Sequence, residues 1–530
     1  MNSCFYYKVT TSQPPHEPAI LKLQQKNDFF ILHYKDQVWH FTNITVNENS
    51  VGGEIVDLVG HTYYKTTKPN SLNQYRRRDK KNALGIYQDE AEVLNEVHIY
   101  ISEYLQMADN HVSIPEQAID KIEIYNPAIA ATTASIVFPI VIGGAVIVGG
   151  ALAIMMNSMS SGSCPFINVY DGTNYAFTGE IFSGAIRCGL ERDDYLALPA
   201  LAGCEGKYML KMSNEAHEVQ YNNFAELIVA DHPDNLSILI DKYGIVRSFR
   251  KPVTSVEAKN CNGRDILSLI RMKDTLSYAF DEKVKVNKTS EGIVLKFLKP
   301  YNTDSAKLVI RAKNTLWLDL LFAKYFSMFG EKYDDFNKRQ ESVSTKKQID
   351  WALKQNIPLK LYVEKKGKWV FLDYFNIAGP MAFKDDILDF SLDGVNSDTV
   401  KIKLEYGFLF WEIDYAGMDF STDEHVKITR VPTKKALDEN GADLTDFLNH
   451  TDKDYYIQKN IGNEALLTFD MPESSVQYRT IILHTKGYYR ILKEQQGSPD
   501  KKLLRTFRNP GRMPAYSLEM FDKLQAKHNL

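Results

Sequence analysis

The sequence predicts a mainly β protein with several domains of β-barrel or β-sandwich type, one apolar transmembrane-like helix and a helical insertion. Three observations lead to this fold class. Aromatic residues are plentiful, with 30 Tyr and 27 Phe, and they recur beside Val and Ile in short runs typical of strands. The run 134–156 carries no charged residue. Between residues 313 and 355 the apolar residues adopt the period of a helix.

Length and composition limit the classes of protein. A chain of 530 residues is several times longer than a typical domain of about 100 to 150 residues, so several domains are expected. The hydrophobic fraction of 44% and the charged fraction of 25% are ordinary for folded proteins. With 63 basic and 67 acidic residues, no strong overall field draws the chain onto nucleic acid, and we expect no nucleic-acid partner.

Composition shifts along the chain divide it into seven segments. We expect an N-terminal tether at 1–19, a small β-domain at 20–130, an apolar helix and linker at 131–163, a β-rich domain at 164–312, a helical insertion at 313–356, a jelly-roll-like β-sandwich at 357–494 and a C-terminal tail, extended as an arm, at 495–530.

Turn residues between strand-like runs indicate antiparallel hairpins. Asp171-Gly172 separates two such runs, and Lys366-Gly367 separates two more. Lys242-Tyr243-Gly244 supplies a further turn. Glycine is favoured at these turn positions because it tolerates a positive φ.

The uncharged run 134–156 is long enough to cross the hydrocarbon core of a membrane as a helix. Its small residues Ala145, Gly149 and Ala153 repeat every four positions, so in a helix they form a stripe for close helix packing and a homo-oligomer. The alternative is a buried helical hairpin inside a soluble domain, broken at one of the paired glycines.

Cys4 follows a small residue and precedes a polar, Pro-rich stretch, which resembles the mature start of a bacterial lipoprotein. A lipid on Cys4 together with the apolar run would supply the two anchors that stable membrane attachment needs. The alternative is an ordinary cysteine near a frayed terminus, in which case the apolar run acts as a signal-anchor. Both anchors place the protein in the cell envelope.

The helical segment 313–355 carries one apolar face. Asn314 is positioned to cap its start, and Gly330 is positioned to end its first helix. We expect this face to pack on a sandwich as core and not to form a ligand groove. The residues of the face are Trp317, Leu320, Leu321, Tyr325 and Met328.

Signals for catalysis are sparse. Four acids between residues 180 and 194, namely Glu180, Glu191, Asp193 and Asp194, suggest a glycosidic acid pair if they converge in a cleft. No dinucleotide, phosphate-loop or zinc-protease motif accompanies them. We therefore expect no catalytic residue, no cofactor and no metal.

Two further features are candidates, one for a ligand contact and one for a disulfide. Trp411 lies near a predicted sheet edge, where an indole ring can contact a ligand. Cys188 and Cys204 are the closest pair among the internal cysteines and form a disulfide if the compartment is oxidising, whereas reduced buried thiols are the alternative.

Several sequence strings carry a resemblance to a known group. CPFINVYDGTNYAFTGEIFSGAI, LERDDYLAL, KMSNEAHEVQYNNFAELIVADHP, VIRAKNTLW and TKGYYR together resemble a family of uncharacterised proteins, frequent as predicted lipoproteins in the Bacteroidota, with a β-sandwich body. The resemblance covers about residues 164–490 and implies no catalytic residue. Residues 359–420 are similar, more weakly, to galactose-binding-like jelly rolls, which implies ligand contact through loops.

These observations favour a membrane-attached, non-catalytic envelope protein that binds or scaffolds envelope proteins or glycans through its β-domains. One alternative is a carbohydrate-active hydrolase that uses the acids near 180–194. The other is a single-pass ligand sensor that signals through the small-residue stripe.

Overall fold

The computed structural model describes residues 5–12, 29–47, 50–57, 72–75, 80–81, 87–88, 96–106, 110–127, 139–142, 145–148, 165–274, 277–280, 290–473, 478–492 and 495–528. The chain forms two compact units, Met1–Asn157 and Ser158–Leu530. Strands make up 49% of the chain and helices 17%, so the predicted mainly β class is confirmed.

The first unit is built on one nine-stranded sheet. Its buried face includes Leu32, Val97, Ile99 and Ile122, which alternate with outward residues as strands require. All neighbours are antiparallel except the parallel pair β2 and β8. The strand order is β5 (Leu72–Tyr75), β1 (Phe5–Ser12), β11 (Ile119–Pro127), β8 (Glu96–Ile101), β2 (Phe29–Tyr34), β3 (Gln37–Asn47), β4 (Ser50–Asp57), β10 (His111–Pro115) and β9 (Leu105–Gln106).

Within the apolar run, the described residues are strands, which corrects the prediction of a helix there. β12 (Pro139–Ile142) pairs antiparallel with β13 (Ala145–Val148), with Ile142 opposite Ala145. Two runs of three β-branched residues, 140–142 and 146–148, lie on either side of the sequence Gly143-Gly144, which is a hairpin signal. In the part of the chain that the structure describes, no helix is both long and apolar enough to span a bilayer.

The first sandwich of the second unit combines strands from both ends of that unit. Its core packs Val169 and Leu210 of one sheet against Leu227 and Leu483 of the other. One sheet has the order β15 (Tyr175–Glu180), β14 (Phe166–Tyr170), β17 (Lys207–Ser213), β33 (Glu464–Asp470) and β31 (Lys435–Asp438). The other has the order β16 (Arg192–Ala197), β34 (Tyr478–Ile491), β18 (Glu218–His232) and β30 (Lys427–Pro432), with β32 (Tyr456–Gln458) also on β18.

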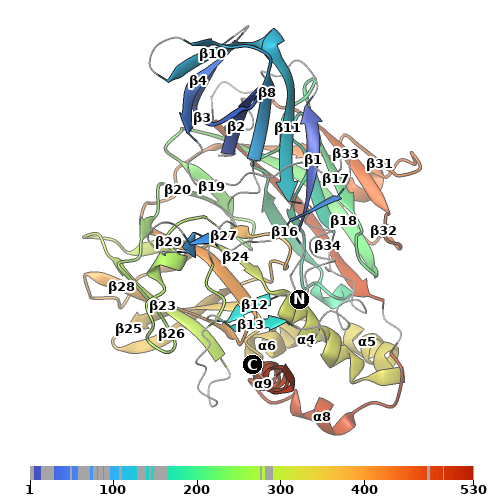
Figure 1. The fold of residues 1–530 in the computed structure, drawn as a ribbon. Helices are drawn as coiled ribbons and strands as arrows, with labels where there is room; N and C mark the ends of the chain where they lie inside the picture. The colour runs from blue at the N-terminus through green and yellow to red at the C-terminus, as the bar shows by residue number, and fades with distance from the viewer. Residues whose placement is uncertain are drawn as a thin grey trace. The chain divides into compact units, whose positions relative to one another are not determined.

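The second sandwich is inserted in sequence between these halves. Leu308 and Ile413 of one sheet pack against Leu295 and Ile402 of the other. One sheet has the order β21 (Val253–Thr254), β29 (Trp411–Asp419), β24 (Ser305–Asn314) and β27 (Lys384–Ser391). The other has the order β22 (Glu257–Asn260), β23 (Ser290–Leu298), β28 (Thr399–Gly407), β25 (Leu359–Lys365) and β26 (Lys368–Phe375). Figure 1 shows the strands of the two sandwiches as separate groups.

The predicted hairpin turns are confirmed. β14 and β15 join through Asp171-Gly172, where Gly172 has a φ of 97°. β25 and β26 join through Lys366-Gly367, and both of these residues have positive φ. The third turn joins the short hairpin of β19 (Ser237–Ile240) and β20 (Val246–Phe249), with Gly244 at a φ of 81°.

Helices follow β24 as the sequence predicts. They are α4 (Leu316–Ser327), α5 (Tyr333–Glu341) and α6 (Thr345–Lys354). The cap of α4 is Thr315, whose side-chain oxygen accepts from the Leu318 N–H, and not Asn314. The Asn314 side chain instead accepts from the backbone N–H groups of Ala378 and Gly379. Leu318, Leu321 and Phe326 of α4 join the core of the second sandwich.

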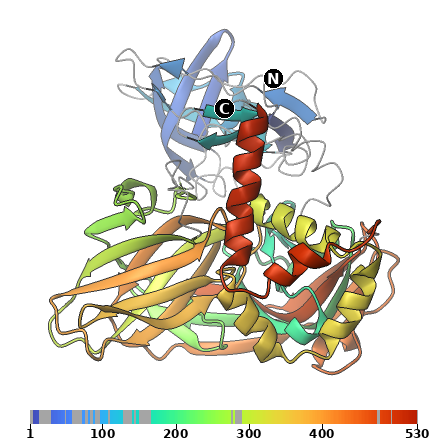
Figure 2. The ribbon, with the colours of Figure 1, turned by 90° about the horizontal axis from the view of Figure 1, so that it is seen from below.

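The C-terminal segment is helical, which corrects the prediction of an extended arm. α8 (Lys501–Thr506) and α9 (Arg512–His528) meet at a sharp turn (Figure 2). Phe507 and Met513 are buried in the core of the second sandwich. Ser517 of α9 accepts a hydrogen bond of 2.7 Å from the Trp317 indole and donates one of 2.8 Å to the carbonyl oxygen of Phe408.

Candidate functional site

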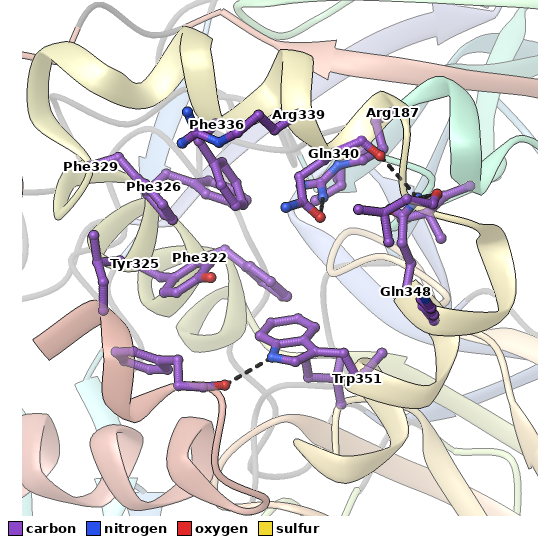
Figure 3. A pocket seen from close by; sticks show the side chains of 18 of the residues that line it. Arg187, Phe322, Tyr325, Phe326, Phe329, Phe336, Arg339, Gln340, Gln348 and Trp351 are labelled. Atoms are coloured by element: carbon purple, nitrogen blue, oxygen red, sulfur yellow. Dashed lines mark hydrogen bonds between the residues drawn. The ribbon is translucent and has the colours of Figure 1, made fainter. Parts of the chain in front are cut away.

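A cavity of about 1690 Å³ lies between the helices and the loops that leave the two sandwiches. Its walls come from α4, α5 and α6, from the loop before β16, from residues 374–377 after β26, and from α8. Figure 3 shows lining side chains and labels ten of them. We refer to this cavity as the helical pocket.

Aromatic rings form one end of the helical pocket. Phe329 and Phe336 stack with centroids 3.9 Å apart, and Tyr325 stacks on Trp351 at 6.0 Å. Phe322 and Phe326 are one helical turn apart on α4 and stack at 5.8 Å. α4 is apolar over more than one face because it packs on the sandwich core on one side and lines the pocket on another.

Arg187 is the charged group inside the pocket. Its guanidinium carbon lies 5.5 Å from the centroid of the Phe336 ring. Nη1 donates a long hydrogen bond of 3.4 Å to the side-chain oxygen of Gln340, and the buried Nε has no acceptor among the described residues. Burial lowers the pKa of Arg187, and only the phenols of Tyr333 and Tyr325 act against that shift. Since arginine remains charged in proteins, the pocket holds a positive charge without a carboxylate partner in the described chain.

Two glutamines complete the polar end of the pocket, opposite the aromatic end (Figure 3). Gln348 is 7% exposed and donates 2.9 Å to the carbonyl oxygen of Val343. Its own Oε1 is buried and has no partner among the residues described. Thr345 donates to the carbonyl oxygen of Gly189, so α6 is fastened to the loop that carries Arg187. The polar end therefore offers one guanidinium and two amides to a ligand.

Positive charge dominates the whole lining. Eight lining residues are basic and two are acidic, which leaves a formal excess of six positive charges. Lys332 pairs with Asp335 at 3.5 Å, and Arg192 donates to the carbonyl oxygens of Ser183 and Ile377. Five exposed cations at the pocket have no ion pair in the described part of the chain: Arg339, Lys347, Lys501, Arg505 and Arg508. Such a lining attracts anions.

Gln355 fastens the C-terminal wall of the pocket. This residue is fully buried, and its amide donates to the carbonyl oxygens of Phe507 and Asn509 while accepting from the Met513 N–H at 2.8 Å. The Trp351 indole also donates to the Phe507 oxygen, at 2.9 Å (Figure 3). These bonds satisfy the backbone groups at the α8 to α9 turn, which would otherwise be buried without partners.

The four acids near 180–194 each have a partner elsewhere in the fold, and none of them lines the pocket. Glu180 accepts from the Met381 N–H, and Glu191 accepts from the Asn223 amide. Asp193 and Asp194 are neighbours on β16, so their side chains leave opposite faces of the sheet.

The pKa values of these two aspartates argue against proton donation. Hydrogen bonding to His484 lowers the pKa of Asp193. Burial alone would raise the pKa of Asp194, but Lys384 and Arg192 outweigh it and lower the pKa. A general acid at neutral pH needs a raised pKa, so the lowered pKa values of Asp193 and Asp194 do not favour the hydrolase.

The other sequence-predicted site residues are separate from the pocket. Trp411 is 1% exposed, and its indole donates 2.9 Å to the carbonyl oxygen of Ile357, which corrects the expectation of a surface ring. Cys188 and Cys204 are free thiols, so the structure has the reduced alternative and not the disulfide. Cys4, Gly149 and Ala153 lie outside the described residues. Ala145 is in strand β13, so the predicted helical stripe does not start there.

The pocket residues could not be distinguished in the sequence from core residues, because a helix that packs in a core has the same apolar pattern. Phe322 extends the apolar character of α4 beyond the buried face that packs on the sandwich, and this excess was a readable signal. Arg187 gave no local signal, since it lies about 150 residues from Phe336 and Gln340 in the sequence.

Comparison with known proteins assigns no relatives. No model of a known protein family matches the chain, and no curated protein matches its sequence. The fold and the pocket therefore define the chain only as a mainly β protein with a large cationic and aromatic cavity.

Proposed function

We propose that the chain is a non-catalytic binding protein and that the helical pocket is the site at which it holds an organic anion. The observation that carries this proposal is the partly buried Arg187 guanidinium, whose buried Nε has no acceptor and which has no carboxylate partner in the described chain. A charged side chain that is partly removed from water without an ion-pair partner destabilises the fold. An anionic ligand would supply the partner that Arg187 lacks.

Titration with 8-anilinonaphthalene-1-sulfonate tests the proposal, since this probe combines aromatic rings with one negative charge. We expect saturable binding with one high-affinity site in the full chain. Arg187→Gln should weaken that binding by roughly tenfold or more, because hydrogen bonds to charged groups contribute about 1.5 to 3 kcal/mol. Arg264→Gln, which changes an exposed arginine outside the pocket lining, should leave it unchanged.

Equal probe affinity in Arg187→Gln and the parent chain would place the anion elsewhere and refute the proposal. Because the probe also binds loosened proteins, the melting temperature of each variant is measured alongside, and only variants that keep it are compared.

The proposal keeps attachment to the cell envelope as a prediction about Cys4. Supporting it are only the residues around that cysteine and the resemblance to lipoproteins. Mass spectrometry of the native N-terminal peptide, produced from the full genomic locus, tests it: an acyl group on Cys4 supports attachment, and an unmodified cysteine contradicts it.

A further inference from the structure

We infer that the ligand of the helical pocket is a long-chain amphipathic monocarboxylate, with its carboxylate at Arg187 and its apolar body among the rings of α4 and Trp351. This inference rests on the proposed function and names its ligand class. It follows from the charge, the shape and the polarity of the pocket.

The number of uncompensated charges selects a monoanion. Two guanidiniums at the pocket are partly buried, and Arg192 lies near the Asp194 carboxylate and donates to two carbonyl oxygens. Arg187 has no carboxylate partner in the described chain. A carboxylate carries one charge and accepts two parallel hydrogen bonds from a guanidinium. A phosphate monoester carries about 1.5 to 2 negative charges at neutral pH, so part of its charge would remain buried and unpaired.

The unsatisfied hydrogen-bond donors of Arg187 also match a carboxylate head group. Nε of Arg187 has no acceptor among the described residues, and its Nη1 bond to Gln340 is long at 3.4 Å. A carboxylate that bridges Nε and an Nη would satisfy the buried donor. The amide nitrogen of Gln340 lines the pocket at the same end and can supply a further donor, whereas the Gln348 nitrogen already donates to backbone oxygens (Figure 3).

The size and lining of the other end select a long apolar body. Ligand pockets usually have volumes of about 300 to 1000 Å³, and the helical pocket has about 1690 Å³. Phe322, Phe326, Tyr325 and Trp351 present ring faces and edges to this part of the cavity. An aliphatic chain gains from burial along its whole length in such a cavity.

The exposed cations serve capture and not head-group recognition. Arg339, Lys347 and Arg505 are in contact with solvent, where salt screens their charge. The Arg187 interaction is buried and is screened much less. Binding should therefore have a salt-sensitive component from the exposed cations and a salt-insensitive component from Arg187.

Calorimetric titration of the full chain tests the ligand class, with probes kept below their critical micelle concentrations. The probes are octanoate, decanoate, dodecanoate, dodecanol and dodecyl phosphate. Affinity should rise by up to about fourfold for each added methylene in the carboxylate series. Dodecanoate should bind at least tenfold more tightly than dodecanol and dodecyl phosphate.

Variants of Arg187 test whether this residue binds the carboxylate head group. Arg187→Gln should abolish the advantage of dodecanoate over dodecanol, and Arg187→Lys, which keeps the charge but not the planar fork, should retain part of it. Arg339→Gln, the matched control at an exposed lining arginine, should change affinity by less than about threefold and only at low salt. Arg187→Lys keeps the test valid if the glutamine variant does not fold.

Three outcomes would overturn the inference: equal binding of dodecanol and dodecanoate, tighter binding of dodecyl phosphate, or no gain from octanoate to dodecanoate. If the sulfonate probe still binds in an Arg187-dependent manner, the proposed function survives and only the ligand class is wrong. If neither the sulfonate nor any carboxylate binds, both fail.

Discussion

Lys384 of β27 forms a buried ion pair with Asp194 of β16 and so joins the second sandwich to the first. The same carboxylate accepts hydrogen bonds from the backbone N–H groups of Phe182 at 2.5 Å and Tyr195 at 3.0 Å. Phe182 precedes the loop that carries Arg187. The pair therefore positions one wall of the helical pocket as well as the contact between the sandwiches.

Replacing Lys384 with Met should strongly destabilise the second unit, because it leaves the Asp194 carboxylate buried without its partner. We expect a loss of about 3 to 5 kcal/mol in the free energy of unfolding, measured by urea denaturation. The double variant Asp194→Asn/Lys384→Met should recover a large part of that loss. If the single and double variants were equally stable, the carboxylate would not be the source of the penalty.

His484 gives the first sandwich a pH-dependent contact. Its Nε2 lies 2.8 Å from Asp193, its Nδ1 lies 2.8 Å from Glu226, and its ring stacks on Tyr195. Arg430 pairs with Glu226 from the next strand. Burial alone would lower the pKa of His484, but the hydrogen bonds to the two carboxylates outweigh it and raise the pKa above its ordinary value of 6.5.

The direction of this shift sets the pH window. A raised folded-state pKa means that His484 stabilises the fold fully below about pH 6.5 and loses this contribution as the pH rises through the folded value. The pKa of Asp193 is lowered, so its contribution is present above about pH 4 and is lost on acidification through its folded-state pKa. The melting temperature of the parent chain minus that of His484→Gln should be largest near pH 5 to 6 and should shrink above pH 7. A difference that grows with pH would contradict the assignment.

We expect Arg187 to favour ligand binding and to lower the stability of the ligand-free chain. Replacing it with Met removes a desolvated guanidinium and keeps apolar volume, so the ligand-free chain should gain about 1 kcal/mol in unfolding free energy. Arg339→Met, at an exposed position of the same lining, should change stability by less than about 0.5 kcal/mol. A clear loss of stability in Arg187→Met would show that the charge is already satisfied within the protein.

Gln355 should control the C-terminal helices. Gln355→Leu leaves the Asn509 carbonyl oxygen and the Met513 N–H without their side-chain partner, while the Phe507 oxygen keeps the Trp351 indole, and we expect a loss of about 2 to 4 kcal/mol. Hydrogen exchange should then accelerate in α9 more than in β18. Uniform acceleration in both elements would mean that α9 does not open separately.

The sequence predicted local features well and distant pairings poorly. The turns at Asp171-Gly172 and Lys366-Gly367 follow from short-range backbone preferences, and the structure has hairpins at both. The run 134–156 predicts a helix because its length matches a membrane, although its Val and Ile residues and paired glycines favour strands, and the structure has strands at 139–142 and 145–148. Its total hydrophobicity was given more weight than its β propensity.

Side-chain roles depended on packing that the sequence did not reveal. Trp411 has the residue type of a ligand contact, yet its indole is enclosed in the core. Arg187 has no neighbouring motif, and only the fold brings it beside Phe336 and Gln340. The candidate site was therefore not predictable from the sequence, although the excess apolar surface of α4 pointed to the helices that form it.

The pairing of β18 with β34 also sets the order in which the chain can mature during synthesis. After Glu218–His232 emerges from the ribosome, about 250 further residues must follow before Tyr478–Ile491 can join it. At roughly 5 to 20 residues per second, this delay lasts on the order of 10 to 50 s. All strands of the inserted sandwich precede β34 in sequence, so they can pair first, although Phe507 and Met513 of its core follow β34. During that interval β18 has an unpaired edge, and we expect the nascent chain to need a chaperone most at this stage.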